Sequence, residues 1–360
     1  MKPYELAGES IAPGERKTVE IPVGSLSSHQ PVFIRAEVLH GKKPGPTVFV
    51  CACLHGDETN SAEIARRLLN SKALKRLRGT LIVTPILNMP AFGNRSRYLP
   101  DRRDLNRLFP GSKNGSLGSR LAYQVCQTIL TQVDLVIDLH TGAVNRPNLP
   151  QVRITSGDTR ARELGEVFGA PVLIESQLRE QSLRSVCFEK QIPILVFEGG
   201  EALRMDTASI RFGERGIMAV LREVGCLSKS AYKLKNGPKP LVAKRSTWER
   251  APKGGLFTPL AALGAVINVG DKLGFVADPY TGVEYPVISD IEGIVIGRTT
   301  EGIADEGDAV YHIAVTSDIL LAEGRLQQDT AFMNRLTEDE DDHPVPYHPF
   351  QDSPHSSDEN

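Results

Sequence analysis

The sequence predicts an α/β fold, in which helices cover both faces of a mixed and mostly parallel sheet, followed by a small all-β barrel-sandwich domain. Apolar runs of strand length alternate with helix-like segments up to about residue 224. Beyond residue 247, short apolar runs are separated by glycine-containing turns. The final stretch, from about residue 337, is acidic and poor in apolar residues. We therefore divide the chain into an α/β domain, an all-β domain and a tail, at residues 1–230, 231–325 and 326–360.

Composition and charge are those of an ordinary soluble globular protein, with 40% hydrophobic and 24% charged residues. The net charge of −2 gives no support for nucleic-acid or anionic-membrane binding. No apolar run reaches the roughly 18 residues of a membrane span, and the N-terminus lacks an apolar signal core. Cys51 and Cys53 read as small apolar residues of one strand. We therefore expect a cytoplasmic protein without membrane or nucleic-acid partners.

In the first third of the chain, the pattern changes from alternating to continuously apolar. Alternation over residues 17–40 predicts half-buried antiparallel strands. Residues 47–54 are apolar on both faces, as is typical of a central strand covered by helices on both sides. Helical spacing over 59–71 and another apolar run over 79–87 continue the series.

A long polar segment, residues 88–118, interrupts the pattern and is rich in Asn, Arg, Pro and Gly. A loop of this length in a compact domain is usually functional. Strands and helices then alternate, which favours a largely parallel sheet. The predicted helices are 119–131, 158–168, 182–190 and 207–224, and the predicted strands are 133–139, 151–155, 171–175 and 193–198.

The region from 247 to 321 contains no good helical pattern and is predicted to be all-β. Trp248, the only tryptophan, is expected to lie in the core of this domain. The tail begins with the acidic run 338–342 and is expected to be disordered, because it has too little apolar surface to bury. Its three histidines are interpreted as solvated residues: His343, His348 and His355.

Two predicted strands end in residues that bind metals. His55 and Glu58 follow the strand 47–54 and are three residues apart, and His140 follows the strand 133–139. Two histidines and one glutamate are the protein ligands of one class of catalytic zinc site, which leaves a fourth position for water. The pairing of His-x-x-Glu with a histidine at a second strand end is more specific than either motif alone. The sequence therefore predicts one Zn²⁺ per chain.

A zinc-bound water needs a general base that is not itself a metal ligand. Glu198 ends the apolar strand 193–198 and is followed by two glycines. Burial disfavours the charge of a carboxylate at such a position, which suits a group that takes up a proton and later releases it. Glu201 is the alternative carboxylate, and we prefer Glu198 because of its position at the strand end.

The segment 94–107 carries five arginines. Arginine binds carboxylates in bidentate fashion and stabilises developing oxyanions. A solvated basic loop and a nucleic-acid site are the alternatives. Asp101 and Asp104 lie among the arginines, and Tyr98 is the only aromatic residue, which disfavours nucleic-acid binding.

Taken in order, four motifs resemble those of the succinylglutamate desuccinylase/aspartoacylase family, within the zinc carboxypeptidase-like superfamily. The motifs are His55-Gly-Asp-Glu58, Asp104-Leu-Asn-Arg107, Asp138-Leu-His140-Thr-Gly and Phe-Glu198-Gly-Gly. The resemblance covers about residues 15–320 and does not fix the substrate. It implies a zinc ion held by His55, Glu58 and His140, with Glu198 activating the water.

The same resemblance implies roles in the arginine-rich segment. Asn106 and Arg107 match a pair that grips a substrate carboxylate, and Asp104 matches a carboxylate that orients a zinc-binding histidine. Arg97 fits the arginine that polarises the scissile carbonyl. Arg103 remains an alternative, because the spacing between Arg97 and Asn106 departs from the family pattern.

The all-β region resembles a biotinyl/lipoyl-type barrel, in which a lysine at a turn carries the cofactor. The corresponding turn here, 278–282, has no lysine, and we interpret the nearby Lys272 as a surface residue. We expect this domain to cover the mouth of the active site or to support a homo-oligomer. The predicted activity is hydrolysis of the amide bond of a small N-acylated amino acid or similar carboxylate. The alternatives are a metallocarboxypeptidase acting on peptides and a non-catalytic zinc-binding or partner-binding scaffold.

Overall fold

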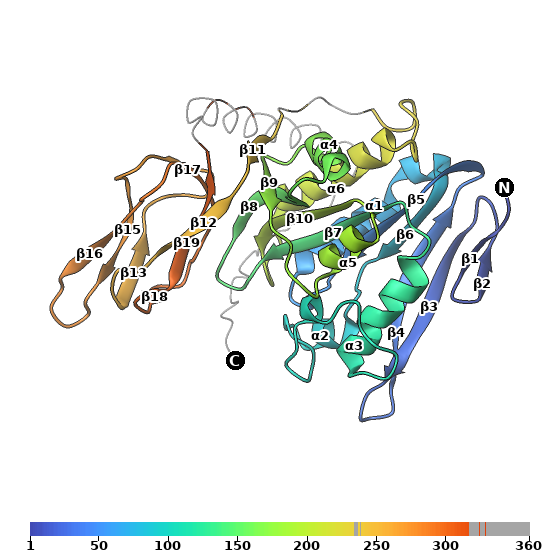
Figure 1. Ribbon diagram of the computed structural model, residues 1–360, viewed down its shortest axis with the longest axis horizontal. Coiled ribbons are helices and arrows are strands. Elements are labelled where there is room, and N and C mark those ends of the chain that lie inside the picture. Colours follow the sequence, from blue (N-terminus) through green and yellow to red (C-terminus); the bar gives the residue numbers. More distant parts are fainter. Residues whose placement is uncertain (234–236, 238, 317–323, 325–327, 329–360) are drawn as a thin grey trace, which may run out of the picture.

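The computed structural model describes residues 1–233, 237, 239–316, 324 and 328. The predicted acidic run and the three histidines of the tail lie outside the described residues. An α/β body containing the N-terminus carries an all-β domain at its opposite end (Figure 1). Across the described ranges, no helix combines the length and the hydropathy that a membrane crossing requires.

One large mixed sheet forms the body, in the order β11-β9-β8-β10-β7-β5-β6-β4-β3. Strands β6, β5, β7 and β10 run parallel to one another, as do β8, β9 and β11. Antiparallel pairing occurs between β10 and β8 and at the edge formed by β6, β4 and β3. The bounds are β3 (Arg16–Ser25), β4 (Pro31–His40), β5 (Lys43–Ala52), β6 (Arg78–Thr84), β7 (Leu135–Gly142), β8 (Asn148–Thr155), β9 (Val172–Ser176), β10 (Ile194–Glu201) and β11 (Leu241–Ala243).

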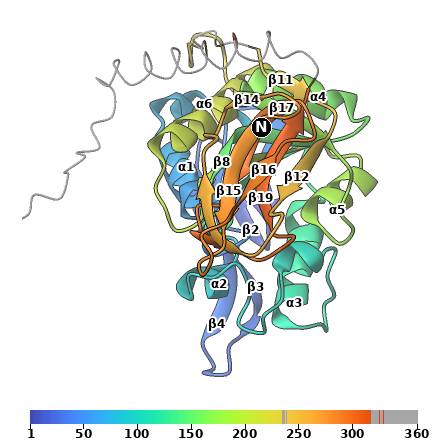
Figure 2. The ribbon, with the colours of Figure 1, turned by 90° about the vertical axis from the view of Figure 1, so that its left-hand side faces the viewer.

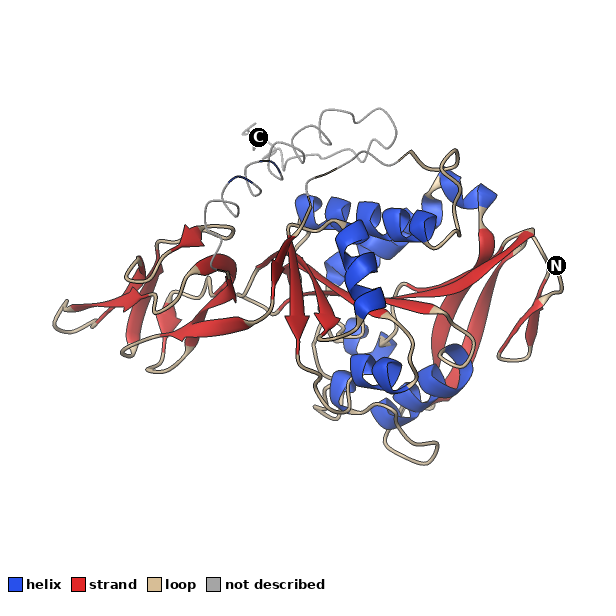
Figure 3. Cartoon of the chain, turned by 45° about the horizontal axis from the view of Figure 1, so that its top comes forward, coloured by secondary structure: helices blue, strands red, loops and turns tan. Residues whose placement is uncertain are grey.

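Helices cover both faces of this sheet, as predicted (Figures 1 and 3). One layer contains α1 (Thr59–Asn70), α4 (Thr159–Phe168) and α6 (Thr207–Glu223). The other contains α3 (Leu117–Gln124), which continues as a π-turn over Val125–Ile129, and α5 (Leu183–Glu189). Short helical segments are α2 (Met89–Gly93), η1 (Lys72–Arg76) and η2 (Leu105–Arg107).

Strand β5 shows why the central strands are apolar on both sides. Val48 and Val50 belong to the core beneath α1 and α6. Phe49 and Cys51 belong to the core beneath α3 and α5. Successive side chains of a strand point to opposite faces, so a strand buried between two helical layers needs apolar residues at every position.

The all-β domain, which faces the viewer in Figure 2, consists of two sheets around a core of its own. One sheet has the order β16-β15-β13-β18, and the other contains β12, β19, β17 and β14. The bounds are β12 (Ser246–Arg250), β13 (Gly255–Pro259), β14 (Val266–Ile267), β15 (Lys272–Ala277), β16 (Glu284–Ile288), β17 (Gly293–Arg298), β18 (Ile303–Ala304) and β19 (Ala309–Val315). A single residue pair, Gly297 with Asn148, joins β17 to β8 of the body.

The described structure differs from the sequence prediction at both ends of the α/β body. A hairpin of β1 (Tyr4–Leu6) and β2 (Glu9–Ile11) precedes the predicted strands. Strand β11 pairs in parallel with β9, so the body extends past the predicted boundary at residue 230. All three of these strands have only three residues, which is too short to give a periodic hydrophobic signal.

Candidate metal centre and active site

Three side chains of the metal-binding type meet beside the ends of β5 and β7. His55 lies in the loop after β5, Glu58 caps the start of α1, and His140 lies in β7. Their candidate ligand atoms all lie within 4.8 Å of one another. The two strands are adjacent and parallel, so their carboxyl ends share one edge of the sheet. All three side chains are buried, with exposed fractions of 2 to 5%.

Each imidazole lies between two carboxylates. Nδ1 of His55 is 2.8 Å from one oxygen of Glu58, and Nδ1 of His140 is 2.8 Å from the other. On the far side of the rings, Nε2 of His55 is 3.1 Å from Asp104 Oδ1, and Nε2 of His140 is 2.9 Å from Asp138 Oδ2. Carboxylates behind ligating histidines fix ring orientation and raise ligand basicity. The donor set therefore fits a divalent ion such as zinc.

The electrostatics of this cluster favour positive charge at its centre. Burial opposes ionisation of Glu58, but the two imidazoles outweigh it and lower the pKa of the carboxyl to about 2. Burial likewise opposes a charge on His55, yet Glu58 and Asp104 raise its pKa above the ordinary value. The pKa of His140 is raised well above the ordinary value, because Asp138 and Glu58 overcome its burial.

Asp138 is a site residue to which our sequence interpretation gave no role. It precedes His140 by two positions in β7, so both side chains point to the same face of the sheet. This i, i+2 spacing within a strand was the available signal. Asp104, by contrast, was expected behind a histidine, and its carboxylate contacts His55.

The two arginines that were alternatives for the carbonyl-polarising role lie in different surroundings. Arg97 Nη2 donates to Asp104 Oδ2 at 3.0 Å, and its Nη1 is 3.8 Å from Glu58 Oε1. The Arg103 side chain is 56% exposed, and its Nε lies 3.6 Å from Asp101. Arg97 lines the pocket around the cluster and Arg103 does not. The structure therefore places Arg97, but not Arg103, in the lining of this pocket.

Asn106 and Arg107 belong to η2 and line the same pocket. Asn106 Oδ1 accepts a hydrogen bond of 2.9 Å from the backbone N–H of Leu183, at the start of α5. Arg107 Nη1 donates to the backbone carbonyl of Asn106 at 2.6 Å. The long loop is thus tied to α5, which holds both side chains at the pocket wall.

Glu198 also lines the pocket, but its surroundings are polar rather than apolar, contrary to our expectation. Asn148 Nδ2 donates to Glu198 Oε2 at 2.7 Å, and Arg153 Nε lies 3.3 Å from Oε1. Both partners come from β8, the antiparallel neighbour of β10, and a strand's own sequence does not reveal its neighbour. Glu201 does not line the pocket and instead accepts from the backbone N–H of Asn145.

The pocket has a volume of about 400 Å³, and the all-β domain supplies part of its wall. Trp248 of β12 stacks on His312 of β19, with ring centroids 4.3 Å apart and planes 5° from parallel. The Arg146 guanidinium lies 5.9 Å from the centroid of the indole ring. Trp248 is half-buried at the pocket rather than in the domain core, so the sequence prediction for this residue was wrong.

Four further arginines line this pocket and were not predicted: Arg146, Arg153, Arg179 and Arg184. Burial, together with the nearby charge of Arg153, lowers the pKa of Arg184 to about 10. These residues are separated widely in the sequence, so no local motif marks them. Together with Arg97 and Arg107 they make the pocket strongly cationic outside the metal cluster.

Comparisons with known proteins identify the family of the chain and proteins of the same fold. A family model described as the succinylglutamate desuccinylase/aspartoacylase catalytic domain matches residues 44–224, half of the chain. An N-alpha-acetyl-L-2,4-diaminobutyric acid deacetylase of Halomonas elongata is 27% identical over 282 residues, covering 75% of this chain and 82% of the relative.

Solved structures show the same fold. A succinylglutamate desuccinylase/aspartoacylase from Rhodobacter sphaeroides matches with a TM-score of 0.75 and 24% identity, covering 84% of this chain and 96% of that one. The product-bound ectoine utilization protein EutE (DoeB) from Ruegeria pomeroyi matches with a TM-score of 0.74 and 25% identity, covering 84% and 95%. The chain described here belongs to the succinylglutamate desuccinylase/aspartoacylase family.

Proposed function

We propose that the protein is a zinc-dependent hydrolase that cleaves the amide bond of a small N-acylated amino acid or similar carboxylate. The observation that carries the proposal is the convergence of His55, Glu58 and His140 within 4.8 Å. These residues would hold one zinc ion per chain, with Asp104 and Asp138 orienting the histidines. When bound, zinc lowers the pKa of a coordinated water and polarises the scissile carbonyl.

Glu198 is proposed as the general base. Its carboxylate would take a proton from the attacking water and later deliver it to the leaving amine nitrogen. The hydrogen bond from Asn148 and the nearby Arg153 keep one orientation of this carboxylate. Arg97, held by Asp104, would donate to the oxygen on which negative charge develops.

The substrate is proposed to be a small carboxylate bound by Asn106 and Arg107. Support comes from the cationic lining of the pocket and from its volume of about 400 Å³, which is in the range of small-molecule sites. The name of the Halomonas relative describes removal of an acetyl group from an amino acid, which is the same kind of reaction. Trp248 and His312 narrow the pocket from the side of the all-β domain, which disfavours long peptides.

The Glu198 role is tested by Glu198→Gln, which keeps the size of the side chain but removes the base. We expect kcat to fall by about 10²- to 10⁴-fold against the best substrate of an N-acyl amino-acid panel, with zinc content unchanged. Glu201→Gln is the matched control, since it makes the same change in the same strand outside the pocket. Amide hydrolysis at the wild-type rate in Glu198→Gln would rule out the base.

The metal assignment is tested separately by metal analysis of His55→Ala. We expect bound zinc to be lost together with activity, because one of three protein ligands is removed. Stoichiometric zinc in this variant would contradict the site. Efficient cleavage of peptides, rather than of N-acyl amino acids, by the wild-type protein would instead favour the metallocarboxypeptidase alternative.

A further inference from the structure

A second hollow, of about 880 Å³, lies at the other end of the strands that lead to the metal cluster. Strand β5 begins at Lys43 beside this hollow and ends at Ala52, three residues before His55. Ten residues of strand span about 30 Å, so the two sites are at opposite ends of the sheet. Nothing in the catalytic proposal uses this end of the molecule.

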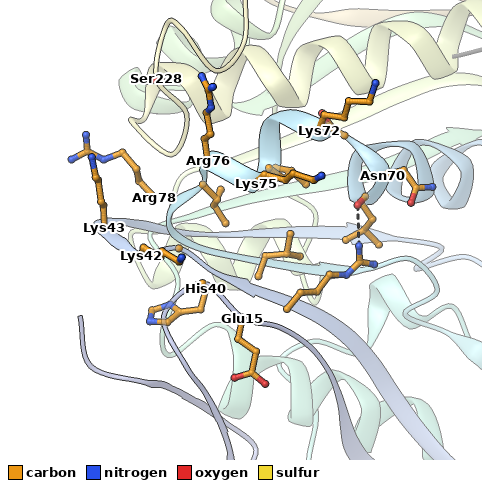
Figure 4. Close-up of a pocket in the computed structure, with 18 residues that line it drawn as sticks. Glu15, His40, Lys42, Lys43, Asn70, Lys72, Lys75, Arg76, Arg78 and Ser228 are labelled. Carbon is orange, nitrogen blue, oxygen red and sulfur yellow. Dashed lines mark hydrogen bonds between the residues drawn. The ribbon is translucent and has the colours of Figure 1, made fainter. Parts of the chain in front are cut away.

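Six exposed cations surround the hollow, which we call the basic pocket (Figure 4). Segment η1 supplies Lys72, Lys75 and Arg76, and the region of the strand ends supplies Lys42, Lys43 and Arg78. No carboxylate within the described ranges pairs with any of these six. Arg16, a further cation of the lining, is paired with Glu37 at 2.8 Å.

The positive charge is concentrated at this hollow. Six cations surround it, and none of them has a carboxylate partner among the described residues. Glu15 is the only acidic residue among the described residues that line the basic pocket. Its Oε2 accepts a hydrogen bond of 2.7 Å from the backbone N–H of Ala12. Among the described residues, a single lining carboxylate therefore stands against six cations, and it is already hydrogen-bonded to the backbone.

Two of the cations are held beside each other by the sheet. Lys43 and Arg78 are paired residues on the adjacent parallel strands β5 and β6, and Figure 4 shows their side chains together. Like charges facing one another across strands are destabilising. Lys42 is constrained as well, since its Cε would lie 2.6 Å from a Cβ placed on Gly14, so its stem packs closely over that backbone. A bound anion would relieve this repulsion.

Apolar residues form the floor of the basic pocket. Leu74 and Leu77 line it and are each only 6% exposed. A cationic rim above a shallow apolar floor suits a compact anion whose charge is spread over several groups. Lysine binds phosphate as a point charge, and several lysines can each take one phosphate of a chain.

We propose that the basic pocket binds a small polyphosphate anion, whose phosphate chain is contacted by Lys43 and Arg78 on one wall and by η1 on another. The shared chemistry is the phosphate chain, which either a nucleoside triphosphate or free inorganic triphosphate supplies. The site is separate from the proposed catalytic centre, so binding and amide hydrolysis are independent properties of the chain.

The test is isothermal titration calorimetry of the full chain with ATP and with inorganic triphosphate, in excess Mg²⁺ and at low and moderate salt. We expect both ligands to bind, with affinity falling as salt rises. Lys43→Glu/Arg78→Glu should weaken binding at least tenfold. Lys113→Glu/Lys244→Glu makes the same charge change on exposed residues outside the basic pocket and should leave it unchanged. Deacylase activity should persist in both variants.

Comparing the affinities of ATP and inorganic triphosphate distinguishes the two sources of the anion. Tighter binding of ATP identifies a nucleotide whose base or sugar contacts the pocket floor, and equal affinities identify the phosphate chain alone. The proposal is overturned if neither binds, if the double variant binds as well as wild type, or if only RNA or anionic vesicles bind. Binding that survives in the double variant would assign the anion to the arginines of the catalytic pocket.

The single variant Lys43→Glu provides a second readout. It places a carboxylate opposite Arg78, so the ligand-free protein should melt at a higher temperature while triphosphate binds at least tenfold more weakly. A residue with a merely structural role would not move the two measurements in opposite directions. A lower melting temperature with unchanged binding would contradict the proposal.

Discussion

At the scale of single residues, neighbouring carboxylates fix the orientation of the two histidines in the candidate metal centre. Glu58 lies between the Nδ1 atoms of both histidines, and a second carboxylate lies behind each ring. An imidazole fixed on both sides has one orientation, so less entropy is lost when a metal binds. The carboxylates behind the rings should therefore affect metal affinity without being ligands.

The substitution Asp138→Asn tests whether the carboxylate behind His140 affects metal affinity. The amide can still contact Nε2 but carries no charge, so we expect zinc affinity to fall by about 10- to 100-fold. Competition titration with a zinc chelator measures the change. Asp134→Asn is the matched control, because Asp134 precedes the same strand at its other end and accepts from the backbone N–H of Thr47. Equal losses in both variants would point to damage of the strand rather than of the centre.

Single residues were predictable where a strand end fixed their position. His55, Glu58 and His140 follow apolar runs, and adjacent parallel strands bring such positions together. The choice between Arg97 and Arg103 was not available from sequence, because the curvature of the loop decides which of them faces inward. The pocket position of Trp248 was missed since one half-buried aromatic residue in a strand has the same local pattern as a core residue.

At the scale of elements, the connection from β5 to α1 is packed closely against α2. A Cβ placed on Gly56 would lie 2.0 Å from the carbonyl carbon of Ala91, a backbone atom that has no room to move aside. Cys53 in the same connection has a φ of 48°, and its N–H is bonded to Ser61 Oγ at 2.9 Å. The connection that carries His55 is thus fixed by backbone contacts at several points.

Gly56→Ala should therefore lower the free energy of unfolding by about 1 to 3 kcal/mol, because the added methyl group overpacks the contact with α2. It should also weaken zinc binding, since the connection carries two of the proposed ligands. Gly93→Ala, at the end of α2 with nothing within 4 Å of its Cβ position, is the control and should change stability by less than about 0.5 kcal/mol. Urea unfolding of zinc-free protein measures both, and equal stabilities would contradict the packing argument.

The predicted elements of the body correspond closely to α1, α4 to α6 and the central strands, because long periodic runs reflect burial on known faces. The helix predicted at 119–131 begins earlier, at Leu117, and ends as a π-turn, which hydrophobic spacing does not reveal. The predicted loop 88–118 contains α2, where Asn88 accepts from Ala91 N–H and proline occupies the first turn. A five-residue helix is too short for the helical spacing of apolar residues to be recognised in the sequence.

At the scale of the whole molecule, the all-β domain completes the pocket of the α/β body. His312 lies on β19 yet faces Arg153 and Arg179 of the body, and its Nε2 is 2.9 Å from Ser246 Oγ. Burial, reinforced by the two arginines, lowers the pKa of His312 to about 3. This histidine therefore stays neutral in the folded protein under conditions in which it would be charged in the unfolded chain.

The pH dependence of stability follows from this difference. Below pH 6.5 the unfolded chain takes up a proton on His312 while the folded protein does not, so lower pH favours unfolding until about pH 3. Between pH 7 and pH 5 the loss amounts to about 2 kcal/mol. His312→Gln, which cannot titrate, should reduce the fall in unfolding free energy over this interval by that amount. Denaturant unfolding at both pH values measures it, and an unchanged fall would contradict the neutral state.

The sequence predicts an α/β domain and an all-β domain but did not reveal their junction, where Val172 and Ile174 pack with Ile294 and Ile296 in one apolar cluster. Strand β11 is only three residues long and joins the body after a segment with no strand pattern. Strands β17 and β8 pair at Gly297 and Asn148, and Gln151 Nε2 donates to the backbone carbonyl of Ile296 at 3.4 Å. Such contacts arise from the folded surfaces of both domains rather than from any local pattern.

The pair of Gly297 and Asn148 lies next to the proposed general base. Asn148 is the point at which β17 meets the body, and its amide also holds Glu198. The side chain that aligns the proposed base is therefore held at the contact between the two domains. A substitution in β17 that displaced Asn148 would therefore disturb the proposed base without changing any side chain of the α/β body.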